Sequence, residues 1–320
     1  RALDDDSRHP LLRAIALLDD LERFHQSQGD GHREAALEAR FERLRRLHQH
    51  FTERSDRAQI TAQLAGLLPA YRSLPWWSMG MALQSELVRE GTGDLKQAYA
   101  LSQAGKQAFP DSIGGKLCDG QLRAISAADY SMESMQSDGL GQRSLRLRHK
   151  NLTELHFRAY RADLQERLEN SQDYNLLYNG DELRRLLRSQ KPVASWVEKL
   201  PATPDYQMHS TYVTPPLKQK GWHIIVVSMR ADFAAANNRV VGTNFIATDL
   251  VVVSRAIDKS LEVTAVSGPT GQPQPGVMVH LYEFNYGGKH RRLDSEKTDA
   301  QGTARFSGSD GKSVFVVAQQ

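Results

Sequence analysis

Cysteine is almost absent from this chain, because Cys118 is the only one in 320 residues. A disulfide within the chain needs two cysteines, and a zinc site built from cysteines needs several, so neither can form here. One cysteine fits a cytosolic protein and also a periplasmic protein that avoids thiols. The cysteine content therefore excludes a disulfide scaffold and leaves the compartment open.

Long apolar runs and an excess charge of one sign are absent too. No stretch approaches the ~20 apolar residues that a membrane-spanning helix needs. The 41 basic residues are balanced by 38 acidic ones, and a net charge of +3 creates no overall field that would attract nucleic acid. We therefore expect no transmembrane segment and no nucleic-acid partner.

Motifs of the common catalytic and cofactor sites are missing as well. The chain has no P-loop, no G-x-S-x-G, no H-E-x-x-H and no Rossmann glycine pattern. Paired carboxylates or an activated nucleophile do not stand out, so we expect no catalytic residue, no cofactor and no metal ligand. His48 and His50, two apart on a helix, cannot point the same way. We expect them, with the arginines of residues 40–46, on a solvated polar face.

The hydrophobic 40% and charged 25% of the chain are typical of folded domains, and the length predicts two or three of them. The chain starts with Arg1 rather than methionine, so we expect a processed protein or a piece of a longer one. Before about residue 127, apolar residues recur at helical spacing. This pattern predicts a bundle of five to six helices over residues 1–127, in which residues 76–110 resemble one tetratricopeptide helix pair without a second copy.

After residue 127, valine, threonine, proline and glycine become more frequent, which favours strands and turns. Short apolar runs separated by turn residues are typical of antiparallel β-sandwiches. We expect one sandwich over residues 128–247 and a second over 248–320. Residues 161–170 and 181–190 have a helical pattern instead, and Asn179 offers an N-cap to the second of them. They predict a helical insertion near residues 161–190, between two strands of the first sandwich.

Cys118 and Gln121 form the sharpest reactive pattern in the chain. A cysteine and a glutamine three residues apart can condense to an internal thioester, an electrophile that captures nucleophiles. Thioester motifs usually read Cys-Gly-Glu-Gln, whereas Asp119 and Gly120 stand at the two middle positions here. This departure favours the other interpretation, a buried cysteine on a helix with a glutamine that makes an ordinary polar contact.

Three aromatic residues of the helical half form a candidate interaction surface. Trp76 and Trp77 open one predicted helix, and Tyr99 lies on the next. A ligand groove lined by these rings is one interpretation. Aromatic residues at the start of a packed helix are more often part of a core, which is the alternative.

The last third of the chain carries a series of motifs in a recognisable order. Residues 216–228 follow a Pro-Leu-x-x-x-Gly-aromatic pattern that ends on a serine, and Thr248-Asp249-Leu250 follows a strand-like run. Then come a strand, loop and strand with Gly271, Pro273, Val277, Val279 and Leu281, and a T-D-x-x-G hairpin with Thr298, Asp299, Gly302 and Phe306. In this order, over residues 128–320, the chain resembles the macroglobulin-like domains of bacterial alpha-2-macroglobulins.

This resemblance implies a fold and a setting. Bacterial alpha-2-macroglobulins are large envelope proteins, usually periplasmic and often lipid-anchored to the inner membrane, that are thought to trap or inhibit proteases. A protease cuts an exposed bait region, and the molecule then rearranges around it. The resemblance implies that this chain is an N-terminal scaffold and docking part, with proteases as partners of the full-length protein and any lipid anchor outside this chain.

Two other functions remain open. The helix pair at residues 76–110 suggests a helical-repeat adaptor fused to Ig-like modules, which would assemble other envelope proteins. An enzyme that acts on an envelope polymer ranks last, because no catalytic set was found.

Overall fold

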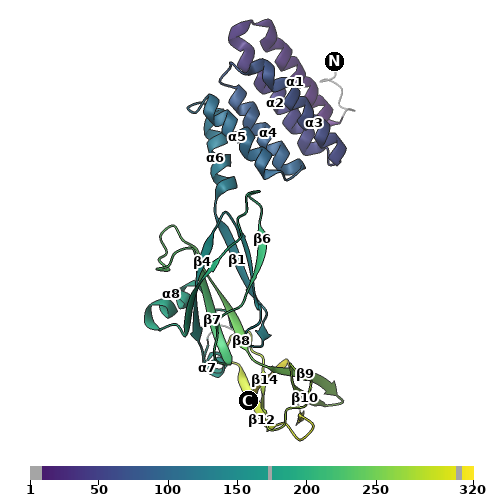
Figure 1. Cartoon of the computed structure of the whole chain (residues 1–320). Coiled ribbons are helices and arrows are strands. Elements are labelled where there is room, and N and C mark those ends of the chain that lie inside the picture. The colour runs from purple at the N-terminus through teal and green to yellow at the C-terminus, as the bar shows by residue number, and fades with distance from the viewer. Residues whose placement is uncertain (1–8, 172–174, 308–311) are drawn as a thin grey trace. The chain divides into compact units, whose positions relative to one another are not determined.

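The computed structural model describes residues 9–171, 175–307 and 312–320, which form two compact units (Figure 1). We call residues 1–128 with 203–208 the helical unit. Residues 129–202 with 209–320 are the sheet unit. The predicted fold class is confirmed: a helical region is followed by β-sandwiches, the first with a helical insertion. A division of the sheet unit at residue 248 stays a prediction.

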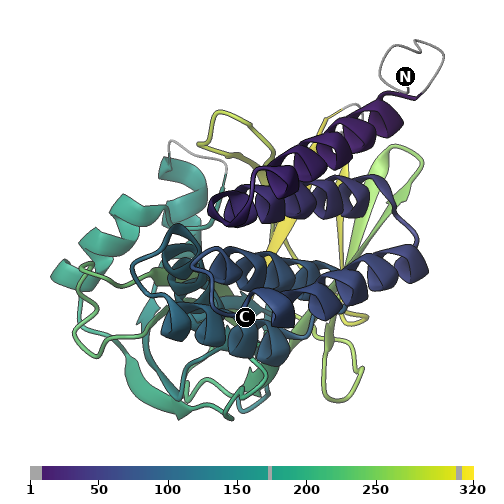
Figure 2. The same cartoon turned by 90° about the horizontal axis from the view of Figure 1, so that it is seen from above.

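The helical unit contains six α-helices among its described residues, as the apolar spacing predicted. Polar side chains start two of them: Asp94 accepts the Gln97 N–H at 2.9 Å, and Ser112 accepts the Gly115 N–H at 2.9 Å. Figure 2 shows the helices from above. Their bounds are α1 Pro10–Ser27, α2 Arg33–His50, α3 Arg54–Leu67, α4 Trp77–Gly91, α5 Leu95–Ala108 and α6 Ile113–Ser126, with the 3-10 turns η1 Asp30–His32 and η2 Leu68–Tyr71.

Glycines let α4, α5 and α6 approach each other closely. A Cβ atom on Gly114 of α6 would lie 2.1 Å from the Met79 nitrogen of α4. A Cβ on Gly105 of α5 would lie 2.6 Å from the Cys118 sulfur. Only glycine fits at such distances, so these helices pack backbone against backbone. The core beside them is apolar and includes Leu37, Phe41, Leu64, Trp77, Met81, Leu83 and Leu87.

The first sandwich of the sheet unit pairs two sheets in the orders β1-β3-β6 and β2-β8-β7-β4-β5. Inward side chains such as Leu147, Phe157 and Val227 fill the space between them. All strand pairs are antiparallel except β2 with β8, which run parallel. The strands are β1 Asp129–Ser134, β2 Ser137–Asp138, β3 Leu145–Lys150, β4 Glu154–Arg161, β5 Ala194–Lys199, β6 His209–Val213, β7 Gly221–Ser228 and β8 Val240–Ala247.

The helical insertion comprises α7 Leu164–Asn170 and α8 Gly180–Ser189, between β4 and β5. Asn179 and Glu182 form a capping box at the start of α8, as the Asn179 pattern suggested. Leu183 and Leu186 pack with Trp222 and Ile224 of β7, opposite the sandwich core. Strand β7 is therefore covered on both faces, which explains its nearly unbroken run of apolar residues.

The second sandwich pairs sheets in the orders β13-β10-β9 and β12-β11-β14 around Val263, Val279, Leu281 and Phe306. Inward and outward side chains alternate along β10 and β13, as expected for sheets with one buried face. A turn predicted at residues 309–311 lies outside the described residues. The strands are β9 Leu250–Ile257, β10 Ser260–Ser267, β11 Met278–Glu283, β12 Arg291–Lys297, β13 Thr303–Ser307 and β14 Val314–Gln319. Within the described ranges, no helix is long and apolar enough to span a bilayer.

The close packing of α6 on α4 gives a testable prediction. Gly114→Ala should lower the free energy of unfolding by about 3 kcal/mol, because the new methyl group overlaps the backbone of α4. Gly120→Ala in the same helix is the matched control. No atom lies within 4 Å of its Cβ position, so alanine should raise the stability by about 0.5–1 kcal/mol. Urea denaturation followed by circular dichroism measures both, and equal effects of the two substitutions would contradict the close packing.

Candidate functional site

Cys118 lies in the interior of the helical unit. Its side chain is fully buried on α6, and its thiol faces the Ser78 carbonyl oxygen at 3.5 Å. Burial raises the pKa of the thiol to about 11. The thiolate is the reactive form of cysteine, and at neutral pH it is almost unpopulated here.

Gln121, one turn further along α6, is held by two other groups. Its Oε1 atom lies 2.8 Å from the Ser102 hydroxyl of α5, and its Nε2 atom donates to the Ala82 carbonyl of α4 at 2.9 Å. The Ser102 hydroxyl also lies 2.8 Å from the Ser85 hydroxyl. These bonds join α4, α5 and α6, and they give Gln121 a structural role separate from that of Cys118.

The structure divides the three aromatic candidates between two clusters. Trp77 is 6% exposed in the main helical core, and Trp76 is half-buried beside that core. The indole N–H of Trp76 donates to the Glu38 carboxylate at 2.8 Å. Tyr99 belongs to a second cluster around Ala98. The three rings thus pack in different clusters, and an interaction surface there stays a prediction.

Tyr99 is covered by a segment that the sequence gave no reason to expect there. Tyr206 stacks on the Tyr99 ring with centroids 4.9 Å apart, and the Gln207 amide donates to the Gly93 carbonyl at 2.7 Å. Tyr206 has a φ of 60°, which is unfavourable for a bulky residue. Its contacts with Val88 and Tyr99 offset that local strain.

The prediction that the histidines and arginines of α2 lie on a solvated face is wrong at two positions. His48 is 1% exposed, with its Nδ1 atom 3.7 Å from Glu90 of α4, and burial lowers its pKa. The Arg43 side chain is 15% exposed and pairs with Asp19 and Glu22 of α1. Both side chains are buried because α1 and α4 pack against α2, and helical spacing within α2 could not reveal that contact.

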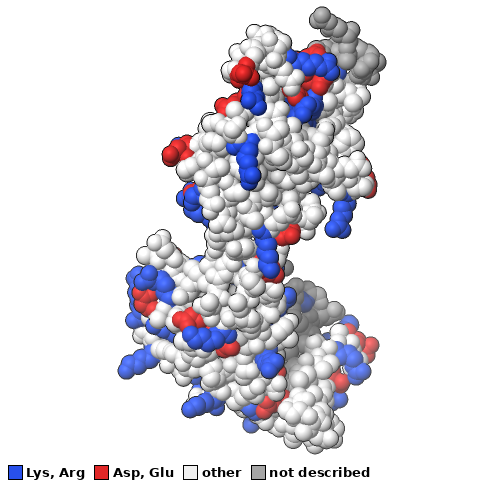
Figure 3. Space-filling view, turned by 45° about the horizontal axis from the view of Figure 1, so that its top comes forward, with Lys and Arg blue, Asp and Glu red and all other residues white. Residues whose placement is uncertain are grey.

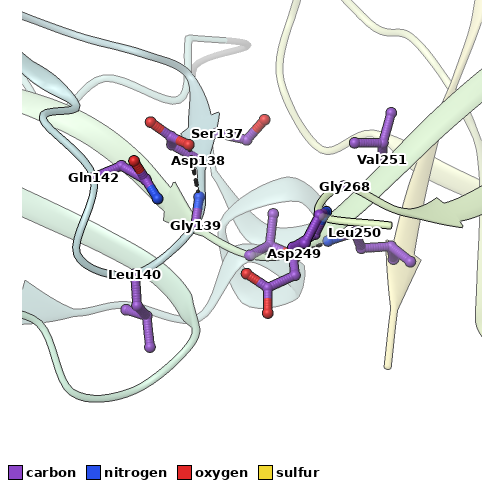
Figure 4. A pocket seen from close by; sticks show the side chains of 11 residues that line it. Ser137, Asp138, Gly139, Leu140, Gln142, Asp249, Leu250, Val251 and Gly268 are labelled. Carbon is purple, nitrogen blue, oxygen red and sulfur yellow. Dashed lines mark hydrogen bonds between the residues drawn. The ribbon is translucent and has the colours of Figure 1, made fainter. Parts of the chain in front are cut away.

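A cavity of about 480 Å³ lies in the sheet unit, lined by residues 137–140, 142, 248–251 and 268–269 (Figure 4). Its two carboxylates already have partners. Asp138 accepts bonds from the Gly139 N–H and the Ser144 hydroxyl, both at 2.8 Å, and Asp249 pairs with Lys220 at 2.7 Å. Both carboxylates are thus engaged by neighbouring groups of the fold.

Charged side chains of both signs lie on the surface of the molecule. On the face drawn in Figure 3, basic and acidic side chains are interspersed. In the part of the chain that the structure describes, no three or more histidine, cysteine, aspartate or glutamate side chains are placed to hold a metal ion.

Comparisons with known proteins point to one group of structures. No protein-family model matches the chain, and no curated protein matches it. The chain is similar to a crystal structure of native alpha-2-macroglobulin from Escherichia coli spanning domains NIE-MG1, with 17% identity and a TM-score of 0.45. This match covers 60% of this chain and 93% of that one.

Two further structures belong to the same group. A longer piece of the Escherichia coli protein, spanning domains MG0-NIE-MG1, is 16% identical with a TM-score of 0.44, and 61% of it is covered. A mutant of Salmonella alpha-2-macroglobulin is 14% identical with a TM-score of 0.40, and 11% of it is covered. Each match covers 60% of this chain. These proteins are of the family that the sequence motifs resemble.

The buried thiol gives the prediction of this subsection. Native protein should react slowly with iodoacetamide near neutral pH, because the pKa of Cys118 is raised to about 11, and the rate should rise sharply in denaturant. Mass spectrometry of the denatured protein should find one free thiol and no methylamine adduct after amine treatment. A thiol that is missing before amine treatment, and that appears together with a methylamine adduct at Gln121 after it, would show a thioester instead, because aminolysis releases the Cys118 thiol.

Proposed function

We propose that this chain is a non-enzymatic N-terminal part of a bacterial alpha-2-macroglobulin-like protein, in which it supplies scaffold and docking surface. One observation carries the proposal. The motif residues of the resemblance occupy turns and caps of the second sandwich where their residue types have distinct structural tasks. A chance match of composition would not place them so.

The T-D-x-x-G hairpin between β12 and β13 is the clearest case. The Thr298 hydroxyl accepts the Val277 N–H at 3.0 Å and donates to the Gln274 carbonyl at 2.6 Å. Asp299 accepts the Thr303 N–H at 2.9 Å and so closes the turn. Gly302 has a φ of 73°, and a Cβ there would lie 2.6 Å from the Ala265 carbonyl oxygen.

Two of the other motifs have comparable tasks. The Thr248 hydroxyl accepts the Leu250 N–H at 3.0 Å, where β8 passes into β9. Gly271 has a φ of 68° in the loop between β10 and β11, and its N–H donates to the Ser267 carbonyl at 2.7 Å. Val279 and Leu281 then place apolar side chains in the sandwich core. The ordered motifs thus account for the framework of the whole second sandwich.

The activity that follows from this proposal belongs to the full-length protein. It would trap or inhibit proteases in the periplasm, associated with the inner membrane through an anchor outside this chain. The proteases are its partners, and this chain holds neighbouring domains in place rather than reacting with them. The buried thiol and the paired carboxylates support a role without chemistry of its own.

The test uses the intact protein, purified from native envelope extracts. Its mass should be well above about 100 kDa, the size of a series of sandwich domains with further modules. Added protease should cut it at a bait region outside residues 9–320 and cause a compaction that size-exclusion chromatography detects. The trapped protease should still cleave small peptides but not large substrates.

The control is the same protease with its active site blocked, which should cause neither cleavage nor compaction. A native product near 36 kDa would contradict the proposal, because no bait region would exist. Cleavage that leaves the protease fully active on large substrates would contradict it as well.

One feature favours the alternative, an adaptor that assembles envelope proteins. Helix α1 packs on α2 with one face, yet Leu17, Leu21 and Phe24 on another stripe are 55%, 41% and 55% exposed. Residues at this spacing form one side of a helix, as in contacts between helices. In this alternative, the apolar face of a partner helix covers the stripe.

The alternative has its own test, carried out in the intact protein in cells. A photo-cross-linking residue in place of Leu17 should give one defined adduct with another envelope protein, because the stripe is covered there. The same residue in place of Lys96, exposed on α5, is the control. Identical adduct patterns at the two positions would contradict the adaptor.

A further inference from the structure

Two histidines that are separated along the chain by a turn lie side by side at one end of the helical unit. His25 lies in the last turn of α1, and His32 ends the 3-10 turn η1 just before α2. Their Nδ1 atoms are 3.2 Å apart, and their rings stack with centroids 5.5 Å apart at 21°. His32 is exposed and His25 is partly exposed, so solvent ions can reach the pair.

The turn between the two helices brings these rings together. Gly29 has a φ of 89°, a conformation that other residues rarely adopt, and it reverses the chain. The Gln28 N–H donates to the His25 carbonyl at 3.1 Å, and the His32 N–H donates to the Gly29 carbonyl at 3.1 Å. The backbone around both histidines is thus fixed by hydrogen bonds of the turn.

Ion pairs one turn earlier hold the two helices in register. Glu22 is only 3% exposed, and its carboxylate lies 2.7 Å from Arg40 and 2.9 Å from Arg43 of α2. The ring of Phe24 contacts the ring of His25 edge to face, with centroids 5.3 Å apart. The ion pairs and ring contacts therefore hold both imidazoles in a rigid helical hairpin. Metal ligands need such support to be preorganised.

We propose that His25 and His32 bind one divalent transition-metal ion through their two Nδ1 atoms. Metal–imidazole bonds are about 2.0–2.1 Å long, so two nitrogens 3.2 Å apart subtend about 100° at a shared ion. This angle lies between the square-planar and the tetrahedral value, and water completes the coordination. In the bound form both Nδ1 lone pairs face the ion, and each neutral ring carries its single proton on Nε2.

The donor set selects the class of ion. Imidazole suits copper, nickel and zinc, and affinity at a given site is highest for Cu²⁺. Calcium and magnesium prefer oxygen ligands and should not compete. The bound ion joins the end of α1 to the start of α2, so binding should stabilise the hairpin against unfolding.

The test uses the untagged chain and Cu²⁺ or Zn²⁺ as probes. Calorimetric titration should show one Cu²⁺ bound, and His25→Gln or His32→Gln should weaken it by about 100-fold, because the second imidazole binds intramolecularly. Electron paramagnetic resonance should show two nitrogen ligands in the original chain and one in each variant. His50→Gln, in the same unit, is the control and should change neither result.

A second measurement follows metal binding through the thermal stability of the protein. Zn²⁺ should raise the Tm of the original chain in proportion to the logarithm of its concentration, and it should not do so in either histidine variant. Gly29→Ala should weaken binding too, because alanine disfavours the positive φ that the turn requires. The effect is not a steric clash, since no atom lies within 4 Å of the Cβ position. Single-nitrogen spectra, or an equal loss of binding in His50→Gln, would overturn the proposal.

Discussion

A buried carboxylate sets the geometry of the first two helices. Glu22 is almost fully enclosed, and an unpaired charge there would cost several kcal/mol. Arg40 and Arg43 must therefore meet it, and this fixes how α1 lies on α2. The same register turns the Leu17–Leu21 stripe of α1 away from α2 and brings His25 over His32. One paired charge thus decides which surfaces of this hairpin are open to partners and ions.

In the sheet unit the corresponding constraint is that each sheet needs cover for its apolar face. Strand β7 alternates between two cores, with Val227 toward the first sandwich and Ile224 toward α8. The helical insertion is therefore part of the fold of this strand rather than an appendage, because without it an apolar face of β7 would meet water. In the second sandwich, two sheets of short strands cover each other's apolar faces, and Thr298 and Gly302 stabilise the turns between strands.

The sequence predicted the parts of the structure that depend on local pattern. Helical spacing located all six helices of the helical unit, and the Asn179 cap located the start of α8. Strands such as β5 and β6 carry no clear sequence signal, since β5 is half-buried and β6 places only Val213 in the core. The burial of His48 and the stacking of Tyr206 on Tyr99 also escaped, because both depend on contacts between distant segments. The same holds for the candidate site. The sequence predicted that Cys118 lies on a helix, but it did not predict the groups that contact Cys118.

The distribution of polar groups connects these features with function. Inside the helical unit, Gln121 is hydrogen-bonded to Ser102, and burial raises the pKa of the Cys118 thiol to about 11. The groups that we propose as metal ligands lie at the surface instead, where the Nδ1 atoms of His25 and His32 are 3.2 Å apart. A buried, unreactive thiol and accessible surface groups are compatible with the scaffold role that we propose. The same arrangement would let metal availability tune the stiffness of that support without involving any catalytic step.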